Sequence, residues 1–320
     1  MASTGLDELV RVQDLWFPEG GLILQAGNRL FRVAGSILAA RSSVFKDMLA
    51  IPQPETQPTI EGCPIVVLHD ESEDVEYFLK AIFDSRFSFE RPPKPTKFVV
   101  VAGVLRLSTK YDVGYLRHRA LLHLSPLSPV SLEEFDNYYD NIRDTTKFFE
   151  VFSRLLLGNS LGLQWVISCA LYEASCNGTV DEILCGFNDP GPRMELPLDL
   201  QRICIKSRNS LVFAQLHDTL GFLVTPHIRG CLSDDQCRAN RTSFYRGLTV
   251  SDDLTPLKYF DAEAWSWSDN CPYCAVCLVA CQDEYEEGRQ RVWDGLPVMF
   301  GLPSWDELRR ARDADLAELE

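Results

Sequence analysis

The sequence predicts an α+β fold for residues 1–125 and a mainly α-helical fold for the rest. Up to residue 125, short apolar runs bounded by turn residues alternate with segments whose apolar residues recur at helical spacing. From Pro126 onward, a proline-marked linker leads into segments that are mostly helix-spaced. We therefore expect three regions: residues 1–125, a helical region at 126–230, and a cysteine-containing helical region at 231–320.

The amino-acid composition is that of a globular protein. The chain has 320 residues, of which 46% are hydrophobic and 24% are charged, so it can form two domains with buried cores. Its formal net charge is −15, which disfavours wide contact with a phosphate backbone. We therefore expect no direct nucleic-acid partner.

The cellular compartment follows from what the sequence lacks. The N-terminal residues do not contain the apolar stretch of a targeting signal. The longest apolar runs, such as residues 98–105, are far shorter than the about 20 residues that a membrane helix needs. We expect a cytoplasmic or nuclear protein with no membrane partner. The eleven cysteines in such a reducing compartment indicate thiols or metal ligands rather than disulfides.

The chain opens with two short apolar runs, DLWF at 14–17 and LILQA at 22–26. Glu19-Gly20-Gly21 between them is a turn signal, so we expect the runs to pair as a β-hairpin, with Gly27-Asn28 closing the second strand. The following segment, SILAARSSVFKDMLA, predicts a helix capped by Ser36. Helical spacing predicts its inner face to be Ile37, Ala40, Val44 and Met48, broadened by Leu38, Phe45 and Leu49.

The remaining elements of this region complete a small sheet with helices on one side. A β-branched run at 64–70 predicts a strand, and the segment capped by Ser72 predicts a helix. A proline-rich loop then leads to two helices, which we expect to be separated near Tyr111-Asp112-Val113-Gly114.

Three segments carry a resemblance to a known family. FRVAGSILAARSSVFKDML resembles the signature segment of the BTB/POZ domain, PIVVLHDESEDVEYFLKAIFD resembles its third strand and following helix, and STKYDVGYLRHRALLHL resembles its closing helices. They occur in the family's order and spacing, over about residues 12–125. The resemblance implies a non-enzymatic protein-interaction module, often a homodimer, and in some members an adaptor for cullin ubiquitin ligases or a transcription regulator.

The resemblance also suggests individual residues. Asp14 stands where the family usually has an aspartate, which makes it a dimer-pocket candidate. The family's histidine and basic residue correspond to Ala34 and Gly35, so the usual partner of this aspartate is missing. A cullin-binding motif would have an apolar residue two positions before Glu90, where this chain has Ser88.

The second half of the chain resembles a large, mostly uncharacterised group of fungal BTB proteins. LGLQWVISCALYEAS and YEEGRQRVWDGLPVMFGLPSWDEL carry this resemblance, which implies an architecture rather than a molecular role. Near the C-terminus, Ser304-x-x-Glu307 is a capping box, which predicts a helix that starts at Ser304. We expect its first turn to dock around Trp305 and its end to fray after about Asp313.

One motif points toward catalysis. Gly158-Asn159-Ser160-Leu161-Gly162 matches the G-x-S-x-G nucleophile elbow of α/β-hydrolases. An elbow follows a buried strand, whereas the preceding FFEVFSRLLL is helix-spaced. We therefore interpret the segment as a helix-to-helix turn and expect no catalytic residue in this chain.

The run NCPYCAVCLVAC contains four cysteines and allows three interpretations. Its C-x2-C-x2-C-x3-C spacing is that of four-iron clusters, but Gln282 follows where such motifs have proline, and no second copy exists. A helix that begins at Asn270 would place Cys274, Cys277 and Cys281 on one packed face. A zinc site would combine Cys271 and Cys274 with Cys231 and Cys237, and would leave Cys277 and Cys281 for packing.

Two functional hypotheses follow from these observations. The main hypothesis is a non-enzymatic interaction protein that self-associates through its N-terminal domain, as an adaptor or a transcription-related scaffold. A cullin ligase is a further candidate partner. The alternative is a metal-binding or redox protein that uses the C-terminal cysteines, with structural zinc as its cofactor.

Overall fold

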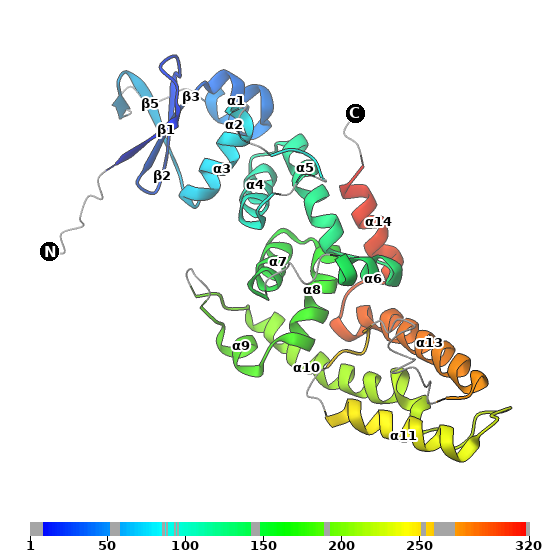
Figure 1. The fold of residues 1–320 in the computed structure, drawn as a ribbon. Helices are drawn as coiled ribbons and strands as arrows, with labels where there is room; N and C mark the ends of the chain where they lie inside the picture. Colours follow the sequence, from blue (N-terminus) through cyan, green and yellow to red (C-terminus); the bar gives the residue numbers. More distant parts are fainter. Residues whose placement is uncertain are drawn as a thin grey trace. The chain divides into compact units, whose positions relative to one another are not determined.

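The computed structural model describes residues 9–51, 58–84, 87, 89–92, 94, 96–141, 148–188, 193–250, 254–258 and 273–317 (Figure 1). The chain divides into two compact units, one formed by residues up to Ser125 with the segment from Asp313, the other by Pro126–Arg312. The first contains a five-stranded sheet with helices, and the second contains the helices that follow. The predicted α+β class is confirmed, while the boundary predicted after residue 230 stays a prediction.

The sheet of the first unit has the strand order β1-β3-β2-β5-β4. Its strands are β1 (Val10–Trp16), β2 (Leu22–Ala26), β3 (Arg29–Val33), β4 (Thr59–Ile60) and β5 (Cys63–Leu68). β2 lies at the centre and is buried at four of its five positions. It runs antiparallel to β3 and parallel to β5. In Figure 1 the helices α1, α2 and α3 lie on one side of this sheet.

The hairpin predicted between the first two apolar runs is wrong. β1 pairs in parallel with β3, whereas the hairpin joins β2 and β3. The two-residue turn Gly27-Asn28 closes that hairpin, and Gly27 has the left-handed φ of +54° that such a tight reversal needs. Because β3 follows so closely, it occupies the edge of β2 that the first run would need.

The helix predicted from Ser36 is two helices, α1 (Gly35–Arg41) and α2 (Ser43–Ala50). Ser42 between them is extended, and its Oγ accepts a hydrogen bond from the Phe45 N–H at 3.0 Å, which caps α2. The restart changes which side chains face inward. Leu38 and Phe45 are fully buried, whereas Ile37 is 45% and Val44 is 40% exposed. The predicted inner face is therefore confirmed for Leu38 and Phe45. It is wrong for Ile37 and Val44.

Three longer helices complete the first unit, α3 (Ser72–Phe83), α4 (Phe98–Lys110) and α5 (Gly114–Leu124). The predicted break between the last two is confirmed, since Asp112 adopts a left-handed φ of +52° there. The ring of Tyr111, at the end of α4, stacks on the Phe45 ring with centroids 4.6 Å apart. This stack joins α2 to α4.

The second unit is helical apart from an isolated bridge between Phe187 and Met194 in the described residues. Short turns of helix occur at Ser125–Leu127 (η1), Gln215–Thr219 (η3) and Gly221–Val224 (η4). The α-helices are α6 (Leu132–Asn141), α7 (Phe148–Leu161), α8 (Gln164–Asn177), α9 (Val180–Cys185), α10 (Leu198–Ala214), α11 (Asp234–Val250), α13 (Ala275–Phe300) and α14 (Trp305–Asp315). α8 is buried at every position from Trp165 to Cys176 and forms the centre of the unit.

One glycine sets the position of the long helix α13. A Cβ on Gly288 would lie 2.1 Å from the carbonyl oxygen of Asp218 in η3, which is far inside a van der Waals contact. Glycine therefore allows α13 to approach the η3 backbone directly. This approach brings the N-terminal half of α13 alongside the segment that leads from η3 to α11.

The helix predicted near the C-terminus begins as expected. Ser304 and Glu307 form the capping box, with the Ser304 N–H donating to the Glu307 carboxylate at 2.9 Å. Trp305 is buried, as predicted. α14 runs on to Asp315, whose carboxylate accepts a hydrogen bond from Arg117 at 2.7 Å. The helix therefore extends past Asp313, because its last residues have partners that the sequence pattern does not reveal.

Candidate metal centre

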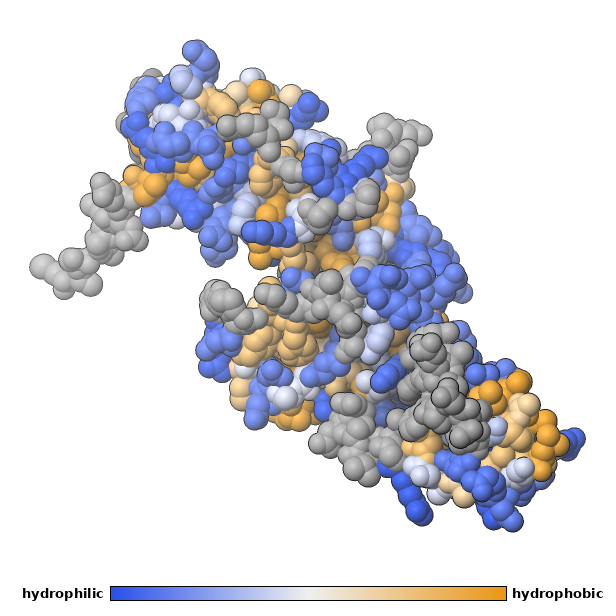
Figure 2. Space-filling model, viewed as in Figure 1, coloured by the Kyte–Doolittle hydropathy of each residue, from blue (hydrophilic) through white to orange (hydrophobic). Residues whose placement is uncertain are grey.

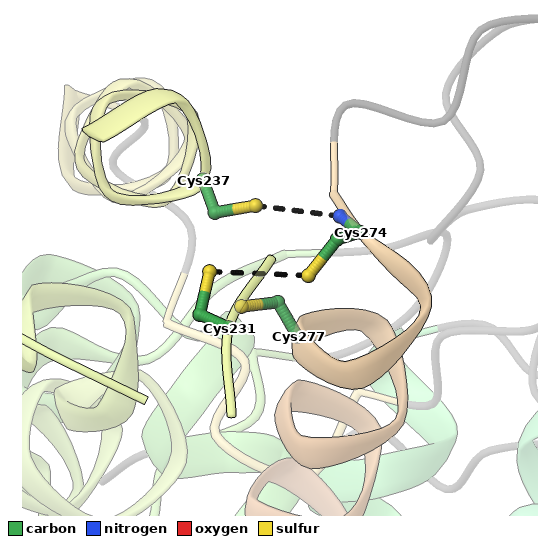
Figure 3. Close-up of side chains that lie close together, drawn as sticks. All are labelled: Cys231, Cys237, Cys274 and Cys277. Atoms are coloured by element: carbon green, nitrogen blue, oxygen red, sulfur yellow. Dashed lines mark hydrogen bonds between the residues drawn. The ribbon is translucent and has the colours of Figure 1, made fainter. Parts of the chain in front are cut away.

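Four cysteine sulfurs meet in the second unit. The Sγ atoms of Cys231, Cys237, Cys274 and Cys277 all lie within 4.8 Å of one another. We call these four residues the thiol cluster. Figure 3 shows their side chains converging from two stretches of chain that are separated by more than thirty residues.

The first two thiols come from the start of α11. Gly230, with a φ of +81°, turns the chain after η4, and the Cys231 N–H donates to the Ile228 carbonyl at 3.0 Å. Cys237 lies one turn into α11, where its N–H donates to the Ser233 carbonyl at 2.9 Å. A tight turn followed by a helix start therefore brings two cysteines with five residues between them to one side.

The other two thiols come from the start of α13. Cys274 is the N-cap residue, with extended backbone angles, and Cys277 lies in the first helical turn. Side chains in a helix point back toward its N-terminus, so a residue in the first turn shares the space beside the cap. The helix start thereby gathers Cys274 and Cys277, which are three residues apart.

The spacing of the sulfurs suits a tetrahedral ion. Four sulfurs at about 2.3 Å from a zinc ion lie about 3.8 Å from one another. The Sγ atoms of Cys231 and Cys274 are 3.9 Å apart, and the other pairs lie within 4.8 Å. These separations exceed the zinc value by at most about 1 Å. Thiolate ligands in this number are typical of closed structural zinc sites.

Backbone N–H groups are already directed at two of the sulfurs. The Leu232 N–H donates to the Cys274 sulfur at 3.5 Å, and the Cys274 N–H donates to the Cys237 sulfur at 3.3 Å. Hydrogen bonds of this kind stabilise a thiolate more than a neutral thiol, because the acceptor then carries the charge. They also fix the direction of each ligand, as partners around metal sites do.

The four thiols differ in their readiness to ionise. The N–H groups of Leu232 and Cys277 lower the pKa of Cys274 to about 6. Burial raises the pKa of Cys237 and of Cys277, both of which are almost completely enclosed. Without a metal the two buried thiols therefore keep their protons at neutral pH, whereas a bound divalent cation would replace those protons.

Three of the four cysteines that the sequence predicts as ligands lie in the thiol cluster. Cys231, Cys237 and Cys274 lie in the cluster as expected, while Cys271 lies outside the described residues and stays a prediction. Cys277, which the sequence assigned to packing, supplies the fourth sulfur. Two overlapping C-x2-C pairs, 271–274 and 274–277, are present in the sequence, and the structure describes both cysteines of the second pair.

Cys281 has the packing role that the sequence predicted. It is fully buried in a hydrophobic cluster with Leu220, Leu223, Phe244 and Tyr285. Burial raises the pKa of its thiol to about 11, so it stays neutral. This apolar cluster joins η4, α11 and α13 beside the thiol cluster.

One residue of this neighbourhood has no signal in the sequence. Arg241, on α11, is fully buried, and its Nη1 lies 3.7 Å from the Cys277 sulfur. An arginine four residues after a cysteine on a polar helix is ordinarily expected in solvent. Only the packing of α11 against α13 turns it inward.

The other residues singled out in the sequence lie elsewhere. Asp14 is 58% exposed at its side chain and forms an ion pair with Lys80 of α3 at 3.7 Å. The Ser160 hydroxyl donates to the Leu157 carbonyl within the last turn of α7, so the turn predicted over residues 158–162 begins only at Gly162. The Glu90 carboxylate pairs with Lys94 at 2.7 Å, and Ser88 lies outside the described residues.

Comparisons of the chain with protein families, with curated proteins and with solved structures give no match. The resemblance to BTB domains therefore stays a prediction. Among the described helices none combines the length and the apolar character that a membrane crossing requires.

Proposed function

We propose that this protein is a non-enzymatic protein-interaction module that self-associates through a BTB-like N-terminal unit. The support is the succession of elements in that unit. A β-hairpin, two short helices, a parallel strand, a helix and a helical pair follow one another over β2 to α5. The three segments that resemble the BTB/POZ family lie over β3 to α2, over β5 to α3, and over the end of α4 with α5.

The observation that carries self-association is the apolar surface of α1 and α2. Most of the N-terminal unit's surface is polar, but apolar residues also reach it (Figure 2). Ile37 on α1, Val44 on α2 and Ile51 just after α2 are 45%, 40% and 62% exposed. Where exposed apolar residues form one contiguous patch, they mark a surface that packs against another protein chain. A second copy of the same chain presents the same residues and can form an isologous contact.

Sedimentation velocity of the full chain at micromolar concentration tests this proposal. We expect a dimer for the wild type and a shift toward monomer for Ile37→Asp, because the new carboxylate would be desolvated at the contact. Val298→Asp, at an 85% exposed position of the other unit, is the matched control and should dimerise like the wild type. A wild-type protein that stays monomeric throughout the concentration series contradicts the proposal.

We further propose that the thiol cluster binds one structural zinc ion. The support is the convergence of four sulfurs within 4.8 Å and the donors already directed at two of them. A zinc ion would join the start of α11 to the start of α13 and so stabilise the adjoining apolar cluster. A redox role, the second part of the alternative hypothesis, has no comparable support.

Metal analysis of the purified protein tests the zinc site. The wild type should carry about one zinc per chain, since all four thiolates bind a single ion. Cys277→Ser should abolish binding, while Cys281→Ser, one helical turn further along α13, should retain it. Cys271→Ser should also retain zinc. If Cys271→Ser loses zinc and Cys277→Ser keeps it, the ligand set predicted from the sequence is the correct one.

A further inference from the structure

Three arginines are fully buried among the described residues, and one of them differs from the others. Arg154 pairs with Glu173, and Arg289 pairs with Asp136 and Glu286. Arg241 forms no ion pair with any carboxylate of the described chain. Its partners are the Thr225 carbonyl oxygen, 2.9 Å from Nη2, and the Cys277 sulfur, 3.7 Å from Nη1.

The guanidinium of Arg241 is incompletely paired as well as buried. Its Nε is enclosed and has no hydrogen-bond partner. Arginine stays protonated in proteins, so this position holds a full positive charge away from water. A buried charge needs an opposite charge nearby, because the loss of hydration is otherwise not compensated.

Two other basic side chains around the start of α11 pair with carboxylates. His227 pairs with Asp234 at 3.0 Å and Arg238 pairs with Asp235 at 2.7 Å, all at or near the exposed start of α11. Among the described residues, the groups next to Arg241 that can carry negative charge are the thiols of Cys277, in the thiol cluster, and Cys281. Four thiolates around a divalent cation would have a net charge of −2, which would supply the counter-charge.

We infer that Arg241 is the charge partner of the zinc-loaded thiol cluster, which its guanidinium contacts through the Cys277 sulfur. This inference rests on the proposed zinc site and assigns a positioning residue to it. Arg241 links three segments, since it belongs to α11 and contacts both the end of η4 and the first turn of α13. In the zinc-loaded protein its charge offsets part of the negative charge of the site.

A purely structural role makes a different prediction. If Arg241 only braces η4 against α11 through the Thr225 carbonyl, its removal weakens the protein equally with and without zinc. If Arg241 compensates the thiolates, its removal weakens the zinc-loaded form. Without zinc, Arg241 has no ion-pair partner among the described carboxylates, so its removal takes away an unpaired buried charge and does not weaken that form.

The test uses the full chain with Arg241→Gln, which keeps a hydrogen-bond donor without the charge, and Arg241→Lys, which keeps the charge. Arg238→Gln, on the exposed face of the same helix, is the matched control. Zinc affinity is measured by competition with a chromophoric chelator, and unfolding midpoints are measured with zinc and with excess chelator. We expect Arg241→Gln to weaken zinc binding by about 10-fold to 100-fold, as loss of a partner around a metal site does.

We further expect Arg241→Lys to bind zinc much more tightly than Arg241→Gln, and Arg238→Gln to match the wild type. The unfolding midpoint of Arg241→Gln should fall in the presence of zinc and should not fall with chelator. Equal losses in both conditions overturn the inference, as does unchanged zinc affinity. If Arg241→Gln does not fold, Arg241→Lys decides, because wild-type-like affinity supports the role of charge and a loss of binding overturns it. A wild type without zinc is a separate result, which removes the proposed zinc site itself.

Discussion

The indole N–H of Trp305 donates a hydrogen bond of 2.7 Å to the backbone carbonyl of Trp293. That carbonyl lies four residues before Pro297, which sits inside α13 and has no N–H to donate to it. The two indole rings also stack, with centroids 4.4 Å apart and planes 3° from parallel. One side chain from α14 thus satisfies the carbonyl that a proline leaves free near the end of α13.

Trp305→Phe should therefore destabilise the second unit by about 1–3 kcal/mol, because the carbonyl loses the indole donor. Trp293→Phe is the control, since it reduces the same ring stack but leaves the carbonyl and its donor in place. Urea unfolding followed by circular dichroism measures both variants. A larger loss for the control would show that ring packing, and not the hydrogen bond, is the main contribution.

Phe45 is fully buried and stacks on Tyr111, so Phe45→Ala should lower the free energy of unfolding of the first unit by about 3–5 kcal/mol. Lys46→Ala changes the residue on the other side of Phe45, which is exposed, and should cost less than about 0.5 kcal/mol. Chemical unfolding of both variants tests which face of α2 packs against the core. Equal effects would contradict the inward direction of Phe45.

Arg154 and Glu173 form a buried ion pair, and Tyr138 donates to the same carboxylate at 2.6 Å. Glu173→Gln should cost about 3–5 kcal/mol, because it leaves the guanidinium buried without a counter-charge. The double variant Arg154→Met with Glu173→Leu should be less destabilised than Glu173→Gln, since both charges are then gone. Measured free energies of unfolding of the two variants test this order. A less stable double variant would contradict the role of the counter-charge.

The Glu134 carboxylate accepts hydrogen bonds from Arg312 at 2.7 and 3.1 Å. Burial alone would raise the pKa of Glu134, but the bonds from Arg312 and from the Val130 N–H outweigh it, so the pKa lies below its ordinary value of 4.5. A carboxyl with a lowered folded-state pKa stabilises the fold above its ordinary pKa, and this contribution disappears as the pH falls through the folded-state value.

We therefore expect the stability of the wild type to decline below about pH 4.5 more steeply than that of Glu134→Gln, which cannot titrate. Unfolding free energies measured from about pH 6 down to about pH 3 give the two slopes. Parallel curves would show that the pair with Arg312 does not contribute to acid sensitivity.

Local patterns in the sequence determined the α+β class, the helical second half and the capping box at Ser304. These features depend on hydrophobic periodicity and on hydrogen bonds between residues a few positions apart, and a single segment contains that information. The burial of Phe45 was also predicted, because either register of its helix turns it inward.

Features that join distant segments were decided by the tertiary structure alone. Ser42 restarts the helix and leaves Ile37 and Val44 exposed, and β3 takes the edge of β2 that the first strand was expected to occupy. The thiol cluster needs the starts of α11 and α13 side by side, and so it includes Cys277 and places Arg241 next to it. Spacing along the chain cannot predict these contacts, because they depend on where each helix begins and on which face its neighbour covers.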